Sequence, residues 1–169
     1  MENKNVFLIG FMGSGKTTIA KRLANKMGRE LIEMDETIEA EEGCSINQIF
    51  ETHGEAYFRD LESKLVARIA EHGKTVVSCG GGAVLREENV LNMRKNGKII
   101  YLSATPETIF ERVKNSNNRP LLNGNMNVEY IAQLMEKRLP IYEQAADIVI
   151  DVNNKEKFEI VAEILSLDV

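Results

Sequence analysis

Glycines and a Lys-Thr pair near the start of the chain have the spacing of a nucleotide phosphate-binding loop. The pattern G-x-x-x-x-G-K-[ST] is satisfied by Gly10, Gly15, Lys16 and Thr17. Such a loop curls its backbone N–H groups around phosphate oxygens, and glycine allows the close approach because it has no Cβ. The lysine ammonium then reaches the β- and γ-phosphates, and the threonine hydroxyl binds Mg²⁺. The pattern therefore predicts a nucleoside triphosphate site that uses Mg²⁺ as its cofactor.

The sequence on either side of this loop favours the same interpretation. The apolar run 6–9 before it is typical of a buried strand, and the apolar spacing after Thr18 is typical of a helix. That helix would point its free N–H groups and its positive dipole end at the phosphates. A glycine-rich turn without a ligand is the simpler alternative. The predicted nucleotide-binding residues here are Gly13, Ser14, Gly15, Lys16, Thr17 and Thr18.

Two acidic residues at the end of a second apolar run are candidates for metal binding and proton transfer. Glu33 and Asp35 are two residues apart, so in an extended strand both carboxylates leave the same face. One could assist the metal while the other receives a proton from an acceptor hydroxyl. Alternatively, Asp35 caps a helix that begins at Glu36.

Arginines and a glycine triplet complete the set of candidates. Arg119 stands in the polar stretch 115–127, where closure of a loop would bring its guanidinium over a transferring phosphoryl group. Arg59 could instead form a surface ion pair with a nearby glutamate on a helix, Arg119 and Arg138 could be solvated, and the triplet could be a turn. The remaining candidates of this group are Arg112 and Gly80, Gly81 and Gly82.

The elements that would position these residues alternate between strand and helix. Strands are expected at residues 6–9, 30–34, 75–79, 98–102 and 147–152. Helical patterns are expected after residue 18, in pieces over 36–72 with breaks near Gly43 and Gly54, over 86–96, from 105, over 128–144 and after 157. The piece before His72 is expected to bury Leu61, Leu65, Val66 and Ile69, and the final helix to carry Phe158, Val161, Ala162 and Leu165 on one stripe.

This alternation predicts an α/β fold with a five-stranded parallel sheet and helices on both faces. Ligands bind beyond the carboxyl ends of the strands in such folds. We therefore expect the phosphate loop, Asp35 and the glycine triplet to meet at one edge of the sheet.

Composition limits the class of protein. A chain of 169 residues is expected to form one domain, and its net charge of -5 argues against binding to nucleic acid or to a membrane surface. Cys44 and Cys79 are too few and too far apart for a disulfide framework or a metal site. We expect both thiols to be reduced and the protein to be cytoplasmic, since neither a signal peptide nor a membrane span is visible.

The motifs together resemble those of the shikimate kinases, and the resemblance covers nearly the whole chain. The phosphate loop has the family's form, G-F-M-G-S-G-K-T. The segment 54–62 is similar to the family's G-E-x-x-F-R-x-x-E, and the glycine triplet and R-P-L-L at 119–122 follow in the family's order. The segment 138–142 matches R-x-P-x-Y. The phosphate loop is shared by many families, whereas the other motifs in this order are specific.

The resemblance implies a nucleoside-monophosphate-kinase-like P-loop fold and transfer of phosphate from ATP to the 3-hydroxyl of shikimate. It implies that Arg59 and Arg138 hold the shikimate carboxylate, that residues 80–82 line its pocket, and that Arg112 lies against the adenine ring. Arg119 would belong to a lid at about 112–126, and residues 36–62 would form a substrate-binding helical segment. Lys16, Asp35 and Arg119 are then the expected catalytic residues.

The resemblance also implies that Thr17 and Glu33 bind the metal. The family usually has D-x-D at this place, where the first aspartate assists Mg²⁺ and the second binds shikimate hydroxyls. This chain has Glu33 at the first position, so a longer side chain would have to meet the metal. The expected partners are ATP and shikimate, and we expect a monomer.

Two alternative functions remain open at this stage. One is another P-loop small-molecule kinase, such as a gluconate kinase, whose substrate also carries a carboxylate. The other is a nucleotide-binding module without transfer activity. A GTP-dependent switch is disfavoured because the chain has no N-K-x-D motif.

Overall fold

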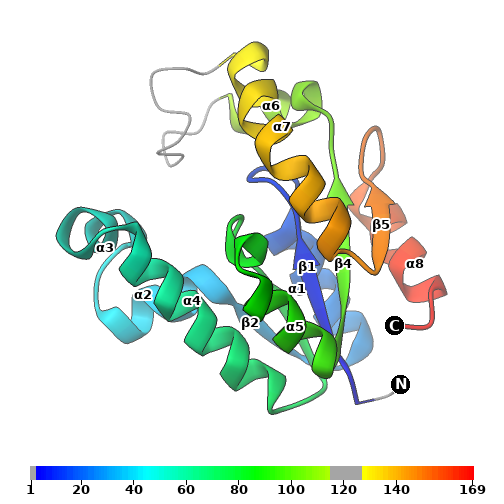
Figure 1. Ribbon diagram of the computed structural model, residues 1–169. Helices are drawn as coiled ribbons and strands as arrows, with labels where there is room; N and C mark the ends of the chain where they lie inside the picture. The colour runs from blue at the N-terminus through cyan, green and yellow to red at the C-terminus, as the bar shows by residue number, and fades with distance from the viewer. Residues whose placement is uncertain (1–2, 115–126) are drawn as a thin grey trace.

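The computed structural model describes residues 3–114 and 127–169, and its centre is one parallel sheet (Figure 1). The strands are β1 (Asn5–Ile9), β2 (Glu30–Glu33), β3 (Thr75–Ser78), β4 (Gly97–Ser103) and β5 (Ile148–Asp151). Their spatial order is β2-β3-β1-β4-β5, and every neighbouring pair is parallel. The predicted five-stranded parallel sheet is confirmed.

Helices cover both faces of this sheet. They are α1 (Lys16–Met27), α2 (Met34–Glu42), α3 (Ile46–His53), α4 (Glu55–Ala70), the 3₁₀ turn η1 (Ala83–Leu85), α5 (Glu87–Lys95), α6 (Pro106–Val113), α7 (Val128–Ala145) and α8 (Lys157–Ser166). Helix α1 contacts β1, β2, β3 and α8, whereas α5 and α7 contact β4. In Figure 1, α5 and α7 lie in front of the sheet and α1 lies behind it.

The central strand explains why the phosphate loop occupies the middle of the binding edge. All of β1 is buried, as expected for a strand covered on both faces, and Leu8 lies between Ser78 of β3 and Ile100 of β4. From β1 the chain winds to one side through β2 and β3, and then to the other through β4 and β5. Such a reversal opens a crevice beyond the carboxyl ends of the central strands.

The helical segment between β2 and β3 breaks where the sequence predicts. Gly43 ends α2 and Gly54 separates α3 from α4, both with positive φ (72° and 85°). Ser45 begins α3 with a capping box, in which its hydroxyl accepts from the Gln48 N–H and the Gln48 side chain accepts from the Ser45 N–H.

The prediction that the second strand, β2, extends to Met34 is wrong. The strand ends at Glu33 and α2 begins at Met34, whose side chain is fully buried together with Ile38 one turn later. Acidic residues in a first helical turn interact favourably with the helix dipole, and Asp35 and Glu36 occupy that turn. Asp35 is consequently a residue of the first turn of α2 and not its cap. Glu33 and Asp35 do not lie on one face of an extended strand.

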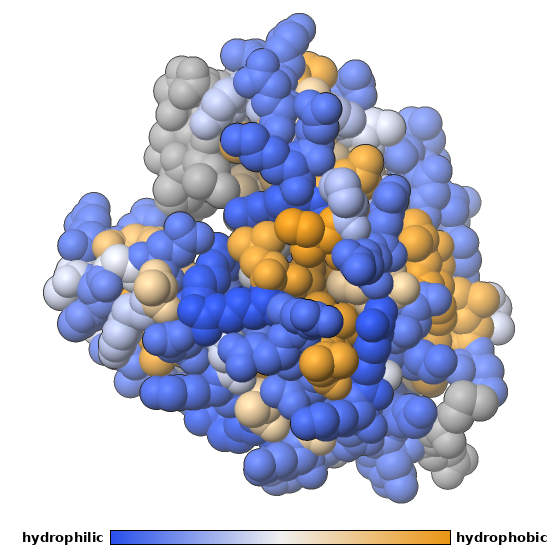
Figure 2. All heavy atoms as spheres, in the orientation of Figure 1, coloured by the Kyte–Doolittle hydropathy of each residue, from blue (hydrophilic) through white to orange (hydrophobic). Residues whose placement is uncertain are grey.

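Two predicted buried faces also differ from the structure. In α8 the buried residues are Ile160, Val161 and Ile164, whereas Phe158 and Leu165 are 65% and 43% exposed. The sequence of α8 carries two overlapping apolar stripes, and the one that begins at Ile160 faces the core. Apolar residues show near β5 and α8 at the right of Figure 2, on a surface that is otherwise mostly hydrophilic.

In α4 the buried set is Phe58, Glu62, Leu65, Val66 and Ile69, and Leu61 is only partly buried. The Glu62 carboxylate therefore faces the core, whereas the apolar pattern predicts that Leu61 does so.

In the part of the chain that the structure describes, no helix combines the length and apolar character needed to cross a membrane. Both cysteines are free thiols.

Candidate active site

The phosphate loop connects β1 to α1 through glycines whose backbone conformation suits no other residue well. Gly13 and Gly15 have φ of 78° and 96°, in the left-handed region, and Gly15 is the N-cap residue of α1. The Ser14 N–H donates to the Phe11 carbonyl at 3.1 Å, which closes the turn. The loop thus places the free N–H groups of the first turn of α1 at the carboxyl edge of the sheet.

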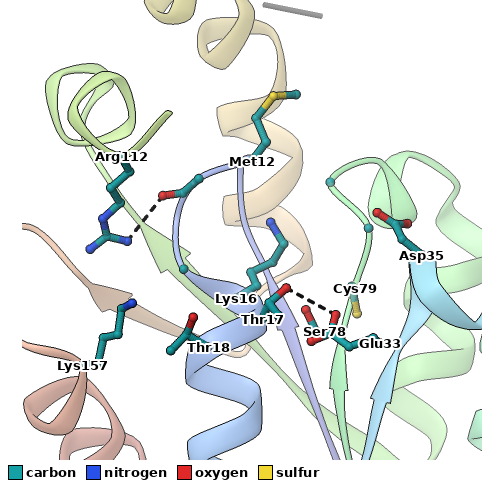
Figure 3. Close-up of a pocket in the computed structure, with 14 residues that line it drawn as sticks. Met12, Lys16, Thr17, Thr18, Glu33, Asp35, Ser78, Cys79, Arg112 and Lys157 are labelled. Carbon is teal, nitrogen blue, oxygen red and sulfur yellow. Dashed lines mark hydrogen bonds between the residues drawn. The ribbon is translucent and has the colours of Figure 1, made fainter. Parts of the chain in front are cut away.

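Lys16 is held inside the curve of this loop. Its Nζ donates to the carbonyls of Gly10 and Phe11 at 2.7 and 3.1 Å. These contacts keep the ammonium at the floor of a cavity of about 410 Å³ beyond the strand ends. Figure 3 shows Lys16, Thr17 and Thr18 on one side of that cavity and Asp35 on the other.

An oxygen-rich group lies beside Lys16 where β2 and β3 end. The Thr17 hydroxyl donates to Glu33 Oε2 at 3.4 Å, and Glu33 Oε1 is buried without a hydrogen-bond partner in the described residues. Burial raises the pKa of Glu33, while hydrogen bonds from Ser78 and Thr17 oppose that rise. One hydroxyl and one carboxylate suit Mg²⁺, which prefers oxygen ligands and usually keeps waters and substrate phosphates as its other ligands.

The glycine triplet after β3 is surrounded by the predicted acceptor-binding residues. A Cβ on Gly80 would lie 2.8 Å from Glu62 Oε1 and 2.9 Å from Asp35 Oδ1. A Cβ on Gly81 would lie 3.2 Å from Arg138 Nη1, and one on Gly82 would collide with the Arg59 guanidinium. The φ of Gly82 is −105°, so this glycine is required for space and not for its backbone conformation.

The Arg59 guanidinium is held in place by a buried carboxylate. Its Nη1 donates to Glu62 Oε2 at 2.7 Å, and its Nη2 donates to the exposed Glu55 at 3.2 Å. Burial raises the pKa of Glu62, although the adjacent Arg59 guanidinium lowers it in part. Burial lowers the pKa of Arg59, but the Glu62 and Glu55 carboxylates together more than offset this, so the net shift is upward.

Arg138 is positioned from the opposite side by Tyr142, one turn later on α7. The Tyr142 hydroxyl donates to the Gly81 carbonyl at 2.6 Å, and its ring stacks on Tyr101 with centroids 5.2 Å apart. Burial raises the pKa of the Tyr142 phenol, and the Arg138 guanidinium opposes that rise by its charge and by a hydrogen bond. The two arginines thus approach the glycine triplet from α4 and α7.

Arg112 closes the other end of the cavity. Its Nη1 donates to the carbonyls of Ser14 and Gly13 at 2.7 and 3.4 Å, and burial lowers its pKa. Figure 3 shows Arg112 descending from α6 toward the phosphate loop and Lys157 rising from the start of α8. The cavity therefore has two different ends. At one end the Asp35 carboxylate can accept hydrogen bonds, and at the other end Arg112 supplies positive charge.

The structure brings most of the predicted site residues to one cavity. Those that line it are Gly13, Gly15, Lys16, Thr17, Thr18, Glu33, Asp35, Gly80, Gly81 and Arg112. Gly82 is the last residue of the triplet, and Arg59 and Arg138 lie directly beside the triplet. Ser14 turns its hydroxyl inward, where it is buried without a partner among the described residues. Arg119 and most of the predicted lid lie outside the described residues.

Several residues of this site are not predicted from the sequence. Glu62 and Tyr142 stand inside motifs quoted above, but nothing in the sequence shows that their side chains hold the two arginines. Ser78, Cys79 and Lys157 line the cavity as well. Burial raises the pKa of the Cys79 thiol, which is therefore unreactive at neutral pH. The position of Ser78 and Cys79 at the end of the apolar run, directly before the triplet, is the one available signal.

A family model and the known proteins of similar sequence carry the same description. A family model described as shikimate kinase matches residues 12–168. A shikimate kinase of Persephonella marina is 46% identical over 162 residues, covering 96% of this chain and 97% of that protein. A shikimate kinase of Dehalococcoides mccartyi is 44% identical over 160 residues, covering 95% and 90%.

Solved structures agree with the family model. The shikimate kinase from Acinetobacter baumannii in complex with shikimate has a TM-score of 0.90 at 32% identity, covering 97% of this chain and 92% of that chain. A gluconokinase from Sinorhizobium meliloti has a TM-score of 0.61 at 19% identity, covering 96% and 90%, which shows a shared fold alone. The chain belongs to the shikimate kinase family.

Proposed function

We propose that this protein transfers the γ-phosphoryl group of ATP to the 3-hydroxyl of shikimate, giving shikimate 3-phosphate and ADP. The observation that carries this proposal is the arrangement around the glycine triplet. Two guanidinium groups, from Arg59 and Arg138, and the Asp35 carboxylate all reach the space that side chains at positions 80–82 would fill. A small molecule with one carboxylate and several hydroxyls fits that combination of charges.

The acceptor is held by charge-assisted hydrogen bonds. Arg59 and Arg138 bind its carboxylate, and bonds between guanidinium and carboxylate are stronger than those between neutral groups. Asp35 accepts from the acceptor hydroxyls and receives the proton of the 3-hydroxyl as the new O–P bond forms. Glu62 and Tyr142 take part indirectly, because they fix the two arginines.

The donor is held by the phosphate loop. Backbone N–H groups of residues 13–18 surround the phosphates, and Lys16 stabilises charge on the β- and γ-phosphate oxygens. Phosphoryl transfer depends chiefly on alignment and charge neutralisation, so these groups supply most of what the reaction needs. Bound Mg²⁺, held by Thr17 and Glu33, would add positive charge between the phosphates. We assign Arg119 to the lid at about 112–126, where its guanidinium would cover the transferring group and help exclude water.

We further propose that the chain acts as one P-loop kinase domain, in which residues 36–62 bind shikimate, and that it works as a monomer in the cytoplasm. The helices α2 and α4 frame the acceptor end of the cavity, since Asp35 belongs to α2 and Arg59 to α4. This supports the assignment of that segment to acceptor binding.

The position of transfer can be tested by identifying the product. The purified protein is incubated with ATP, MgCl₂ and shikimate, and the product is analysed by proton–phosphorus correlation NMR. We expect the new phosphorus signal to couple to the proton on carbon 3. Coupling to a different ring proton would contradict the proposed orientation of the acceptor, and formation of inorganic phosphate alone would contradict transfer.

A further inference from the structure

The glycine triplet forms a tight turn directly before η1. The Ala83 N–H donates to the Gly80 carbonyl at 3.1 Å, which closes a four-residue turn. Gly81 and Gly82 occupy the two central positions of this turn. Gly82 has φ of −105° and ψ of 7°, close to the values of about −90° and 0° at the third residue of a type I turn. The backbone beside the two arginines is therefore a type I turn.

A turn of this kind has a second form that differs in the orientation of its central peptide. Rotation of the Gly81–Gly82 peptide by about 180° gives a type II turn with the same closing hydrogen bond. The rotation would take the φ of Gly82 from −105° to about +75°, near the type II value of about +80°. Glycine adopts such a positive φ without steric cost, because it has no Cβ. Glycine at this position thus leaves both forms of the turn available.

One side chain fixes the orientation of this peptide. The Tyr142 hydroxyl donates to the Gly81 carbonyl at 2.6 Å. Because the peptide is planar and trans, the Gly82 N–H points away from Tyr142. Burial raises the pKa of the phenol, so the hydroxyl keeps the proton that it donates. In the type II form the Gly81 carbonyl would turn away from Tyr142, and this hydrogen bond would be lost.

The same hydroxyl joins the peptide to one of the two arginines. It accepts a hydrogen bond from Arg138, which lies one turn earlier on α7. Arg138 Nη1 is 3.2 Å from the place of a Cβ on Gly81, and the Arg59 guanidinium fills the corresponding place at Gly82. The central peptide of the turn therefore lies between the two guanidinium groups. A change in its orientation alters the surface between them.

We propose that Tyr142 is a positioning residue that holds the glycine triplet in the type I form and thereby gives the acceptor site one fixed shape. It acts through Gly81 and Arg138. The link to acceptor binding rests on the proposed function, whereas the effect on the turn depends on no ligand. The competing explanation is that Tyr142 only fills the core, since its ring stacks on Tyr101 with centroids 5.2 Å apart.

The effect on the turn is tested with Tyr142→Phe, which keeps the stacked ring and loses only the hydroxyl. A crystal structure of the variant gives the orientation of the Gly81 carbonyl, and NMR relaxation dispersion of the Gly82 amide detects exchange on the microsecond-to-millisecond timescale. We expect the carbonyl to be reversed or to exchange between both orientations. The matched control is Tyr101→Phe, which removes the other hydroxyl of the stacked pair, the one bonded to Ser103, and should leave the turn unchanged.

The consequence for binding is measured by calorimetric titration of the whole protein with shikimate and, separately, with ADP in MgCl₂. Tyr142→Phe should weaken shikimate binding about fivefold, within the range expected for one hydrogen bond, and leave the dissociation constant of ADP unchanged. Tyr101→Phe should leave both constants unchanged. If the unsubstituted protein does not bind shikimate, the proposed function is contradicted, while the crystal structure and the relaxation data still decide the role of Tyr142.

Three results would overturn the proposal. The first is a single, unchanged orientation of the Gly81 carbonyl in Tyr142→Phe without exchange of the Gly82 amide. The second is equal weakening of shikimate and ADP binding, which would assign Tyr142 to the core. The third is an unchanged shikimate affinity despite a reversed peptide, which would show that the acceptor site does not depend on the type I form.

Discussion

Arg59 and Glu62 form an ion pair one helical turn apart, with Nη1 and Oε2 separated by 2.7 Å, directly behind the glycine triplet. The Glu62 side chain is 1% exposed, so its charge is stabilised by the arginine and not by water. This pair fixes the guanidinium that we propose binds the acceptor carboxylate. A buried carboxylate is costly, and its presence in α4 is explained by this positioning role.

Glu62→Gln should raise the KM for shikimate about tenfold and leave the KM for ATP unchanged. Glutamine keeps the size of the side chain but loses the charge that orients Arg59, and one charge-assisted hydrogen bond is worth about 1.5–3 kcal/mol. Steady-state kinetics with each substrate varied in turn measures the effect. The control is Glu55→Gln, which removes the exposed partner of Arg59. An equal rise in both KM values would mean that Glu62 supports the fold and not the acceptor site.

Gly82→Ala should weaken acceptor binding without destabilising the protein. The φ of −105° suits alanine, so the backbone need not change, but the new methyl group collides with the Arg59 guanidinium. We expect the KM for shikimate to rise more than tenfold, since the strong bonds to its carboxylate are displaced. Gly81→Ala, whose methyl group would lie 3.2 Å from Arg138, should have a smaller effect. A Gly82→Ala protein with unchanged KM would show that Arg59 does not bind the acceptor.

Lys16→Ala should reduce kcat by about 10²–10³, the usual loss when one preorganised charge is removed from a transition state. The substitution removes the ammonium now held by the Gly10 and Phe11 carbonyls. A coupled assay of ADP release gives kcat directly. Near-normal turnover would overturn the assignment of the phosphate loop.

The pH dependence of stability should report the burial of Glu62. Its pKa in the folded protein lies above the ordinary 4.5, so the folded state retains a proton that the unfolded state has already released. This contribution to the free energy of unfolding is fully present below the unfolded pKa and is lost as pH rises through the folded pKa. Glu62→Gln lacks it, so the stability of the variant relative to the parent should increase as pH rises from about 4 to 7.

Urea denaturation at a series of pH values measures this difference. The Arg59 guanidinium opposes part of the rise in the pKa of Glu62. The stability difference should therefore change more steeply with pH when Arg59 is also replaced by methionine. A stability difference that does not vary with pH would contradict a raised pKa for Glu62.

The sequence predicts the phosphate loop well because its information is local. Gly10, Gly15 and Lys16 act through their own backbone and their immediate neighbours, and so does the strand before them. The five strands are predictable for a similar reason, since each is an apolar run bounded by turns. These patterns also suffice to bring the phosphate loop, Asp35 and the glycine triplet to one edge of the sheet.

The parts that the sequence does not predict depend on contacts between distant segments. Nothing near Glu62 indicates that Gly80 and Asp35 lie beside it, and the apolar spacing of α4 favours Leu61 as the buried residue. Lys157 reaches the cavity only because α8 packs beside α1. The boundary between β2 and α2 is shifted because burial of Met34 outweighs the pattern expected of an extended strand.

Phosphoryl transfer to shikimate is measured as ADP release in the presence of ATP and Mg²⁺, with shikimate, with gluconate and without an acceptor. We expect strong stimulation by shikimate alone, with loss of that stimulation in Arg59→Ala through a higher shikimate KM. Stimulation by gluconate alone would identify a different small-molecule kinase. Slow release that neither compound stimulates would contradict the proposed transfer and leave only a nucleotide-binding site.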